Sequence, residues 1–138
     1  MKKSRLPTIQ EIEELTAFLS RLYLEGNSPI VNWGGGEKQK DGSFTSPYPN
    51  YNNIVEEFFR LAPSACWSDY EYIPEQAGQM LRDQNLIKTA SLARIKTMLT
   101  FCVRGERFSD GHWGDMIKRG HIRQLLERLN EIKSEQLK

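Results

Sequence analysis

A short stretch rich in glycine and charge, Cys102 to Trp113, is the feature that most constrains how this chain can fold. It separates two apolar runs, and both repeat apolar residues at the three- and four-residue spacing of a helix with one buried face. These residues are Leu92, Ile95, Leu99, Cys102 and Val103 before the stretch, and Met116, Ile117, Ile122, Leu125, Leu126 and Leu129 after it. The stretch, called the corner below, therefore predicts a bend between two packed helices.

The corner contains residues suited to ending one helix and starting another. We expect Gly105 to follow a helix that ends at Arg104 and to adopt a positive φ, which glycine does without a Cβ penalty. Asp110 is expected to cap the next helix by accepting hydrogen bonds from its first amides. Phe108 and Trp113 are expected to pin the corner against the core, and a buried indole would need a hydrogen-bond acceptor.

Two interpretations compete for the other polar side chains of the corner, which are Arg104, Glu106, Arg107 and His112. In the first, the arginines pair with Glu106, Asp110 and helix-end carbonyls, so that the corner is an ionic staple between helices. In the second, two guanidinium groups and an imidazole beside a helix N-terminus form a receptor for a carboxylate or phosphate. The staple is the more common arrangement, and the two do not exclude each other.

As the leading hypothesis, the chain is a binding or interaction module for an anionic small molecule or a protein partner. Its expected ligand-binding residues are Arg104, Arg107, His112, Trp113, Glu106 and Asp110. The first alternative is a small enzyme in which Glu106 or His112 acts as general acid or base. The second is a structural adaptor in which the corner is only a staple. Oligomeric state does not follow from any of these patterns.

Catalytic and metal signatures elsewhere are weak. Cys66 and Cys102 lack paired CxxC spacing and are expected to be buried thiols. His112 and His121 lack the helical spacing of zinc motifs. Ser109 lacks the turn context that aims a serine nucleophile at a base. We therefore expect no metal site and no cofactor.

Length and charge limit the remaining classes. The 138 residues suit one domain, 1–138, whose residues 1–6 form a frayed basic terminus. A net charge of +1 gives no general attraction to nucleic acid, and no helix-turn-helix pattern is visible. Because no apolar run could span a bilayer and no signal core follows the basic start, we expect a cytoplasmic protein without membrane contact.

The rest of the chain predicts a mainly α fold, a compact single-domain helical bundle. A capping box at Thr8 and Glu11 opens a helix to about Leu24. Further helices are expected before Pro63, from Pro74, from Ser91 to Arg104, from Trp113 to Arg119, and from His121 to about Gln136. Between the first two helices, residues 27–49 are expected to form a long loop or a small β-hairpin, because Asp41-Gly42 is a hairpin turn signal.

Many aromatic residues fall on or beside irregular segments, where rings line clefts as well as core edges. They are Trp33, Phe44, Tyr48, Tyr51, Trp67, Tyr70 and Tyr72. If some of these rings lie exposed near the corner, they would form an aromatic pocket with a basic floor. Such a pocket would suit a planar or acidic small molecule, or a peptide.

The residues of the corner also resemble the pattern of a known protein family. Its segments Cys102 to Phe108 and Asp110 to Trp113 resemble the signature of a bacterial family of uncharacterised proteins, a domain of unknown function. Segments on both sides are similar to the same pattern, so that the likeness covers most of the chain. They include Trp33, Asp41-Gly42, Pro47-Tyr48, Tyr51, Gly120-His121-Ile122 and Leu126 to Leu129. The resemblance implies that the corner is the family's hallmark, and it implies no activity.

Overall fold

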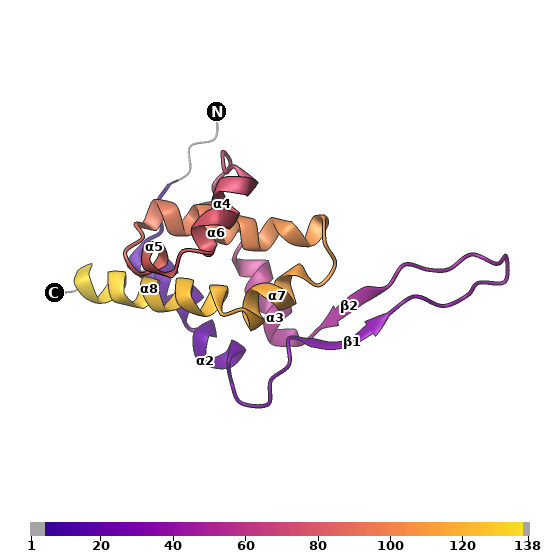
Figure 1. Ribbon diagram of the computed structural model, residues 1–138. Helices are drawn as coiled ribbons and strands as arrows, with labels where there is room; N and C mark the ends of the chain where they lie inside the picture. Colours follow the sequence, from indigo (N-terminus) through magenta and orange to yellow (C-terminus); the bar gives the residue numbers. More distant parts are fainter. Residues whose placement is uncertain (1–4, 137–138) are drawn as a thin grey trace.

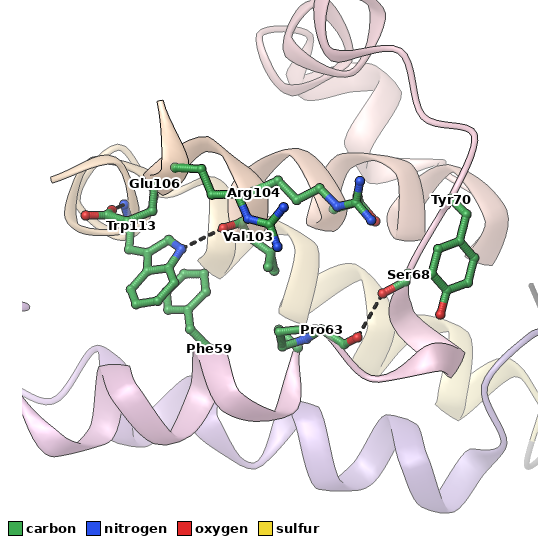
Figure 2. A pocket seen from close by; sticks show the side chains of 11 residues that line it. Phe59, Pro63, Ser68, Tyr70, Val103, Arg104, Glu106 and Trp113 are labelled. Carbon is green, nitrogen blue, oxygen red and sulfur yellow. Dashed lines mark hydrogen bonds between the residues drawn. The ribbon is translucent and has the colours of Figure 1, made fainter. Parts of the chain in front are cut away.

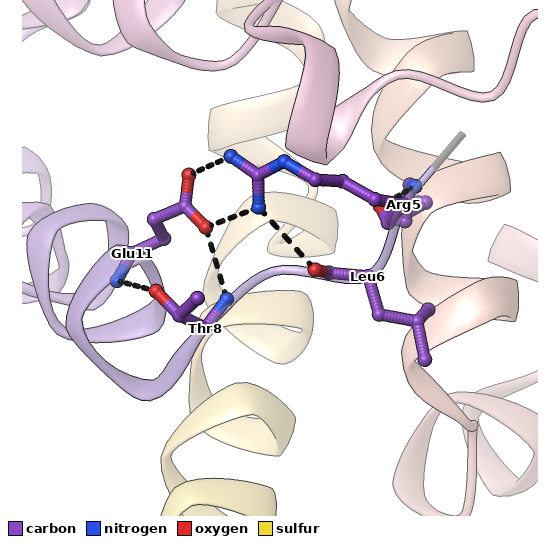
Figure 3. A network of polar contacts seen from close by, with 5 residues as sticks. Arg5, Leu6, Thr8 and Glu11 are labelled. Carbon is purple, nitrogen blue, oxygen red and sulfur yellow. Dashed lines mark hydrogen bonds and ion pairs between the residues drawn. The ribbon is translucent and has the colours of Figure 1, made fainter. Parts of the chain in front are cut away.

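The first helix starts at the predicted capping box in the computed structural model, which describes residues 5–136. The Thr8 side chain accepts from the Glu11 amide, and the Glu11 carboxylate accepts from the Thr8 amide at 3.0 Å. The same carboxylate binds both nitrogens of the Arg5 guanidinium fork at 2.7 Å (Figure 3). Arg5 holds the pKa of Glu11 well below its usual range. Arg5, which lies in the predicted frayed terminus, is thus joined to the start of the first helix by this ion pair; residues 1–4 lie outside the described residues.

The predicted single helix to Leu24 is divided in two. Helix α1 spans Ile9–Thr16 and α2 spans Phe18–Leu22. The break follows Thr16, whose hydroxyl donates to the Ile12 carbonyl at 2.9 Å. A side chain that bonds back to this carbonyl competes with the helix ladder and bends it.

A small β-hairpin follows, which is one of the two forms, a long loop or a hairpin, predicted for residues 27–49. Strands β1 (Ile30–Gly34) and β2 (Tyr48–Tyr51) pair antiparallel, with Ile30 opposite Tyr51 and Gly34 opposite Tyr48. Because the first helix is divided, the hairpin lies between α2 and α3 in chain order. Figure 1 shows that residues 30–51, called the arm below, extend away from the helical body.

The remaining elements are helical, so the mainly α class is confirmed. They are α3 (Asn53–Leu61), the 3-10 turn η1 (Ala65–Trp67), α4 (Pro74–Leu81), α5 (Gln84–Lys88), α6 (Leu92–Arg104), the 3-10 turn η2 (Gly105–Arg107), α7 (His112–Lys118) and α8 (His121–Gln136). Asn52, Asp83 and Ser91 cap α3, α5 and α6 with side-chain oxygens. Gly120, with φ 84°, ends α7 as predicted.

The core lies around α8, which packs against α1, α2, α5, α6 and α7. The buried apolar side chains form one connected cluster, which includes Ile12, Phe58, Trp67, Ile95, Leu99 and Leu126. Trp67, expected on an irregular connector, is thus a core residue. No helix within residues 5–136 is long and apolar enough to cross a membrane.

Tyr23 joins the last two helices to α2. Its hydroxyl donates to the Ile117 carbonyl at 2.9 Å and accepts from the Arg123 amide at 3.0 Å. We expect Tyr23→Phe to lower the free energy of unfolding by about 1–3 kcal/mol, because both partners lose a hydrogen bond. Urea unfolding measures this change, with Tyr48→Phe as the control, since the Tyr48 ring is about half exposed on the arm. Equal stability of the two variants would contradict the role of the Tyr23 hydroxyl.

Candidate functional site

Glu106 organises the corner, and it takes the capping role that was predicted for Asp110. One carboxylate oxygen accepts from the Trp113 amide at 2.8 Å, and the other accepts from the Gly111 amide at 3.0 Å. Gly111, with φ 90°, is the residue that precedes α7 and has the left-handed backbone. Asp110 is exposed and makes no capping bond to α7. The prediction of an Asp110 cap is therefore wrong.

Gly105 is required for a reason different from the predicted one. Its backbone is right-handed, with φ −60°, because the chain continues from α6 into the 3-10 turn η2. A Cβ atom at this position would overlap the imidazole ring of His112. The prediction of a positive φ at Gly105 is wrong, and glycine is needed there because the ring lies directly against the backbone.

His112 is half-buried within the bend. Its Nε2 lies 3.2 Å from the Phe101 carbonyl near the end of α6, so this nitrogen donates to it. Its ring also packs edge-on against Phe101, with 5.3 Å between centroids. Burial lowers the pKa of His112 from its ordinary value, which favours the neutral ring. His112 thus links the two helices across the corner.

The corner also holds the base of the arm. The Tyr51 hydroxyl on β2 donates to the Glu106 carboxylate at 2.7 Å, and burial followed by this carboxylate raises the pKa of Tyr51 above its ordinary range. Gly111 lies against the Trp33 ring and Gly114 lies against Ile30. A larger side chain at either glycine would push the arm away. The corner therefore connects three parts of the fold: α6, α7 and the arm.

The predicted ionic staple is not formed. Within residues 5–136, neither Arg104 nor Arg107 belongs to an ion pair. The Arg104 guanidinium instead lies over the Tyr72 ring, 5.4 Å from its centroid. Phe108, predicted to pin the corner, is 85% exposed. The indole of Trp113 is half-buried and donates to the Val103 carbonyl at 2.9 Å, which confirms its predicted need for an acceptor.

A cavity of about 510 Å³ opens beside the corner, between α3, α6 and the start of α7. Phe59 and Trp113 form its apolar end, with their rings stacked at 4.4 Å and an interplanar angle of 4°. Figure 2 shows these two rings at one side, Ser68 and Tyr70 at the other, and Arg104 between them. The lining also includes Pro63, Val103, Glu106 and Arg107. Four of the six predicted site residues thus border one cavity, whereas His112 and Asp110 do not.

Phe59, Pro63 and Tyr70 line the cavity but were not predicted as site residues. Phe59 carries the apolar periodicity of α3 and looks like any core residue in the sequence. Tyr70 is one of seven aromatic residues on or beside irregular segments, and nothing in its neighbours singles it out. No local pattern indicates that these segments lie opposite the corner, because that proximity depends on how α3 and α6 pack.

Within the described residues, metal-ligating side chains do not cluster, and both cysteine thiols are buried. Within residues 5–136, no three side chains of the metal-ligating types His, Cys, Asp and Glu are close enough to hold an ion. Cys66 and Cys102 are both buried, as predicted, and neither forms a disulfide. Burial raises the pKa of the Cys66 thiol to about 11 and that of the Cys102 thiol further, so both are protonated at neutral pH.

Residues 7–135 match a family of unknown function, DUF6508. The chain belongs to this family. The predicted membership in an uncharacterised family is thereby confirmed, whereas a bacterial source and the corner as the family signature stay predictions. Searches of curated proteins and of solved structures each found no match. Family membership therefore brings no activity to the corner or to the cavity.

Replacing Glu106 should weaken both α7 and the base of the arm. We expect Glu106→Ala to lower the free energy of unfolding by about 2–4 kcal/mol, because three donors lose a charged acceptor. Glu106→Gln should cost less, since its amide oxygen can still accept. Urea unfolding gives the costs, and amide exchange at Gly111 and Trp113 should accelerate in both variants. Glu25→Gln, in an exposed turn, is the control; unfolding that matches this control would rule out the capping role.

The two histidines should make stability depend on pH. Burial lowers the pKa of both His112 and His121, so protons bind more weakly to the folded chain than to the unfolded chain. Their contribution to stability is therefore complete above the ordinary imidazole pKa of about 6.5 and is lost as pH falls below it. NMR titration of the ring protons should give values below 6.5 for both, and His121→Gln should retain part of the acid-induced loss. A His112 pKa at or above the free value would refute this.

Proposed function

We propose that this protein is a binding module whose cavity holds an anionic ligand that also has an apolar part. The observation that carries the proposal is the pair Arg104 and Arg107, which line one cavity without an ion pair among the described residues. Guanidinium groups match carboxylate and phosphate oxygens in charge and in shape. Arginine side chains left without acids at a cavity rim are suited to an external anion.

The apolar residues that line the cavity are the reason why the proposed ligand has an apolar part. Phe59, Pro63, Val103 and Trp113 supply most of one side, and a volume of about 510 Å³ lies within the range of small-molecule sites. One face of Trp113 is covered by Phe59, and Tyr51 packs at a tilt, 5.3 Å from it. A ligand would therefore meet the edge of the indole, and its apolar part would rest against Pro63 and Val103.

Glu106 and His112 do not supply a second candidate function. The two Glu106 oxygens together accept three hydrogen bonds from Tyr51, Gly111 and Trp113. His112 is turned toward Phe101 and does not line the cavity. Arg104 and Arg107 are therefore the proposed ligand contacts, and Glu106 and Trp113 form the supporting wall.

A thermal-shift screen of carboxylates, sugar phosphates, nucleotides and aryl phosphates, followed by calorimetry, tests the proposal. Phenyl phosphate should bind more tightly than inorganic phosphate if the apolar wall contributes. We expect Arg104→Gln and Arg107→Gln each to weaken binding about tenfold, corresponding to about 1.4 kcal/mol. Arg94→Gln, at an exposed position on α6, the helix that also carries Arg104, is the matched control.

Failure to stabilise the protein with any compound would contradict the proposal. Binding that is equally strong in the two cavity variants and in Arg94→Gln would also contradict it, because the ligand would then occupy another surface. Without ligand, Arg107→Gln should unfold like the wild type, since neither arginine joins an ion pair within residues 5–136. Arg104→Gln should lower the free energy of unfolding by no more than about 1 kcal/mol, because it loses the contact with the Tyr72 ring.

A further inference from the structure

The apolar end of the cavity is a stack of two aromatic rings that meets the cavity with its edges. The Phe59 and Trp113 rings lie parallel, with 4.4 Å between centroids and an interplanar angle of 4°, and both border the cavity. If the cavity lay over the outer face of one ring, that ring would screen the other ring from it. Because both rings border the cavity, the stack presents the edges of both. Figure 2 shows the two rings together at one side of the cavity.

Neighbouring side chains hold this stack in position. The Trp113 indole donates to the Val103 carbonyl at 2.9 Å, and the Tyr51 ring lies 5.3 Å from the Trp113 ring. The Phe58 ring packs edge-on against Phe59, with 5.0 Å between centroids, and Phe59 is only 4% exposed. The ring edges are therefore in place before a ligand arrives, so that binding loses little side-chain entropy there.

The polar groups of Trp113 and Glu106 already have partners. The indole N–H is used by the Val103 carbonyl, and the Glu106 oxygens accept from the Tyr51 hydroxyl and from the amides of Gly111 and Trp113. A nucleobase placed against the stack would give up hydrogen bonds to water without replacing them, which costs free energy. A hydrocarbon ring has no such hydrogen bonds to lose. The stack therefore favours a ring without polar substituents.

We infer that the apolar part of the ligand is an aromatic hydrocarbon ring, so that the ligand is an aryl phosphate or an aryl carboxylate. The inference rests on the proposed anion-binding cavity. Ring edges carry partial positive charge and ring faces partial negative charge, so an aromatic ring that lies with its face on the edges of Phe59 and Trp113 gains an edge-to-face contact. A saturated ring of similar size buries apolar surface but has no such face. The anionic group then lies toward Arg104, which Figure 2 shows between the stack and Tyr70.

Two matched pairs of compounds test the inference by calorimetry on the full chain. Phenyl phosphate is compared with cyclohexyl phosphate, and benzoate with cyclohexanecarboxylate, at a mildly alkaline pH where both members of a pair carry the same charge. We expect the aryl member of at least one pair to bind about 2–12-fold more tightly, the factor that an aromatic contact supplies. The pair that binds shows whether the anionic group is a phosphate or a carboxylate. Adenosine monophosphate should bind more weakly than phenyl phosphate, because its base carries polar groups.

A variant of the stack should reduce the preference for aryl compounds. Phe59→Leu removes one of the two ring edges, so the two members of a pair should bind within about twofold of each other. Because Phe59 is buried, this variant is measured at a temperature where circular dichroism shows it to be folded. Phe44→Leu, at a ring that is 69% exposed on the arm and outside the cavity lining, is the matched control and should keep the preference.

NMR of the wild type gives a measurement that needs no variant. The edge protons of Phe59 and Trp113 would lie over the face of a bound aromatic ring, whose ring current shifts their resonances upfield. Phenyl phosphate should produce this shift, and cyclohexyl phosphate should not.

The outcomes separate this inference from the ligand proposal. Equal affinity within both pairs, an unchanged preference in Phe59→Leu, tighter binding of adenosine monophosphate than of phenyl phosphate, or no upfield shift would overturn the aromatic ligand. Each of these results would leave an anion site at Arg104 and Arg107 intact. If none of the compounds binds, or if binding does not depend on Arg104 or Arg107, both proposals fail.

Discussion

The carboxylate of Glu106 is the interaction on which the rest of the corner depends. It gathers the Tyr51 hydroxyl and the amides of Gly111 and Trp113, at 2.7 to 3.0 Å. Those donors belong to the arm and to the start of α7, whereas Glu106 itself lies in the turn that follows α6. A negative group beside the first amides of a helix is favoured by their exposed dipoles. One side chain therefore sets the relative positions of three segments.

The candidate cavity and the base of the arm share residues of the corner. Glu106 and Trp113 line the cavity, and both also contact Tyr51 at the base of the arm. A binding event at Arg104 or Arg107 would therefore occur next to the residues that hold the arm. The exposed tip of the arm, by contrast, does not line the cavity.

Much of the local structure could be predicted, because it depends on short-range chemistry. The capping box at Thr8, the hairpin turn at Asp41-Gly42 and the end of α7 at Gly120 each involve residues a few positions apart. The predictions that failed concern roles that two nearby residues could fill equally well as judged from the sequence. Asp110 and Glu106 could both reach the start of α7, and only the path of the η2 turn brings the longer side chain to it.

The amino-acid sequence by itself determined the helical class, a break in the helices at residues 27–49 that is either a long loop or a hairpin, and the clustering of Arg104 and Arg107 on a short segment. These follow from periodicity, turn chemistry and adjacency in the chain. Only the tertiary structure decided that Phe59 and Tyr70 face those arginines, that His112 turns inward against Gly105, and that Phe108 points to solvent. These positions depend on how helices that are distant in the sequence pack together. The residue pattern of one segment does not indicate which other segment it will contact.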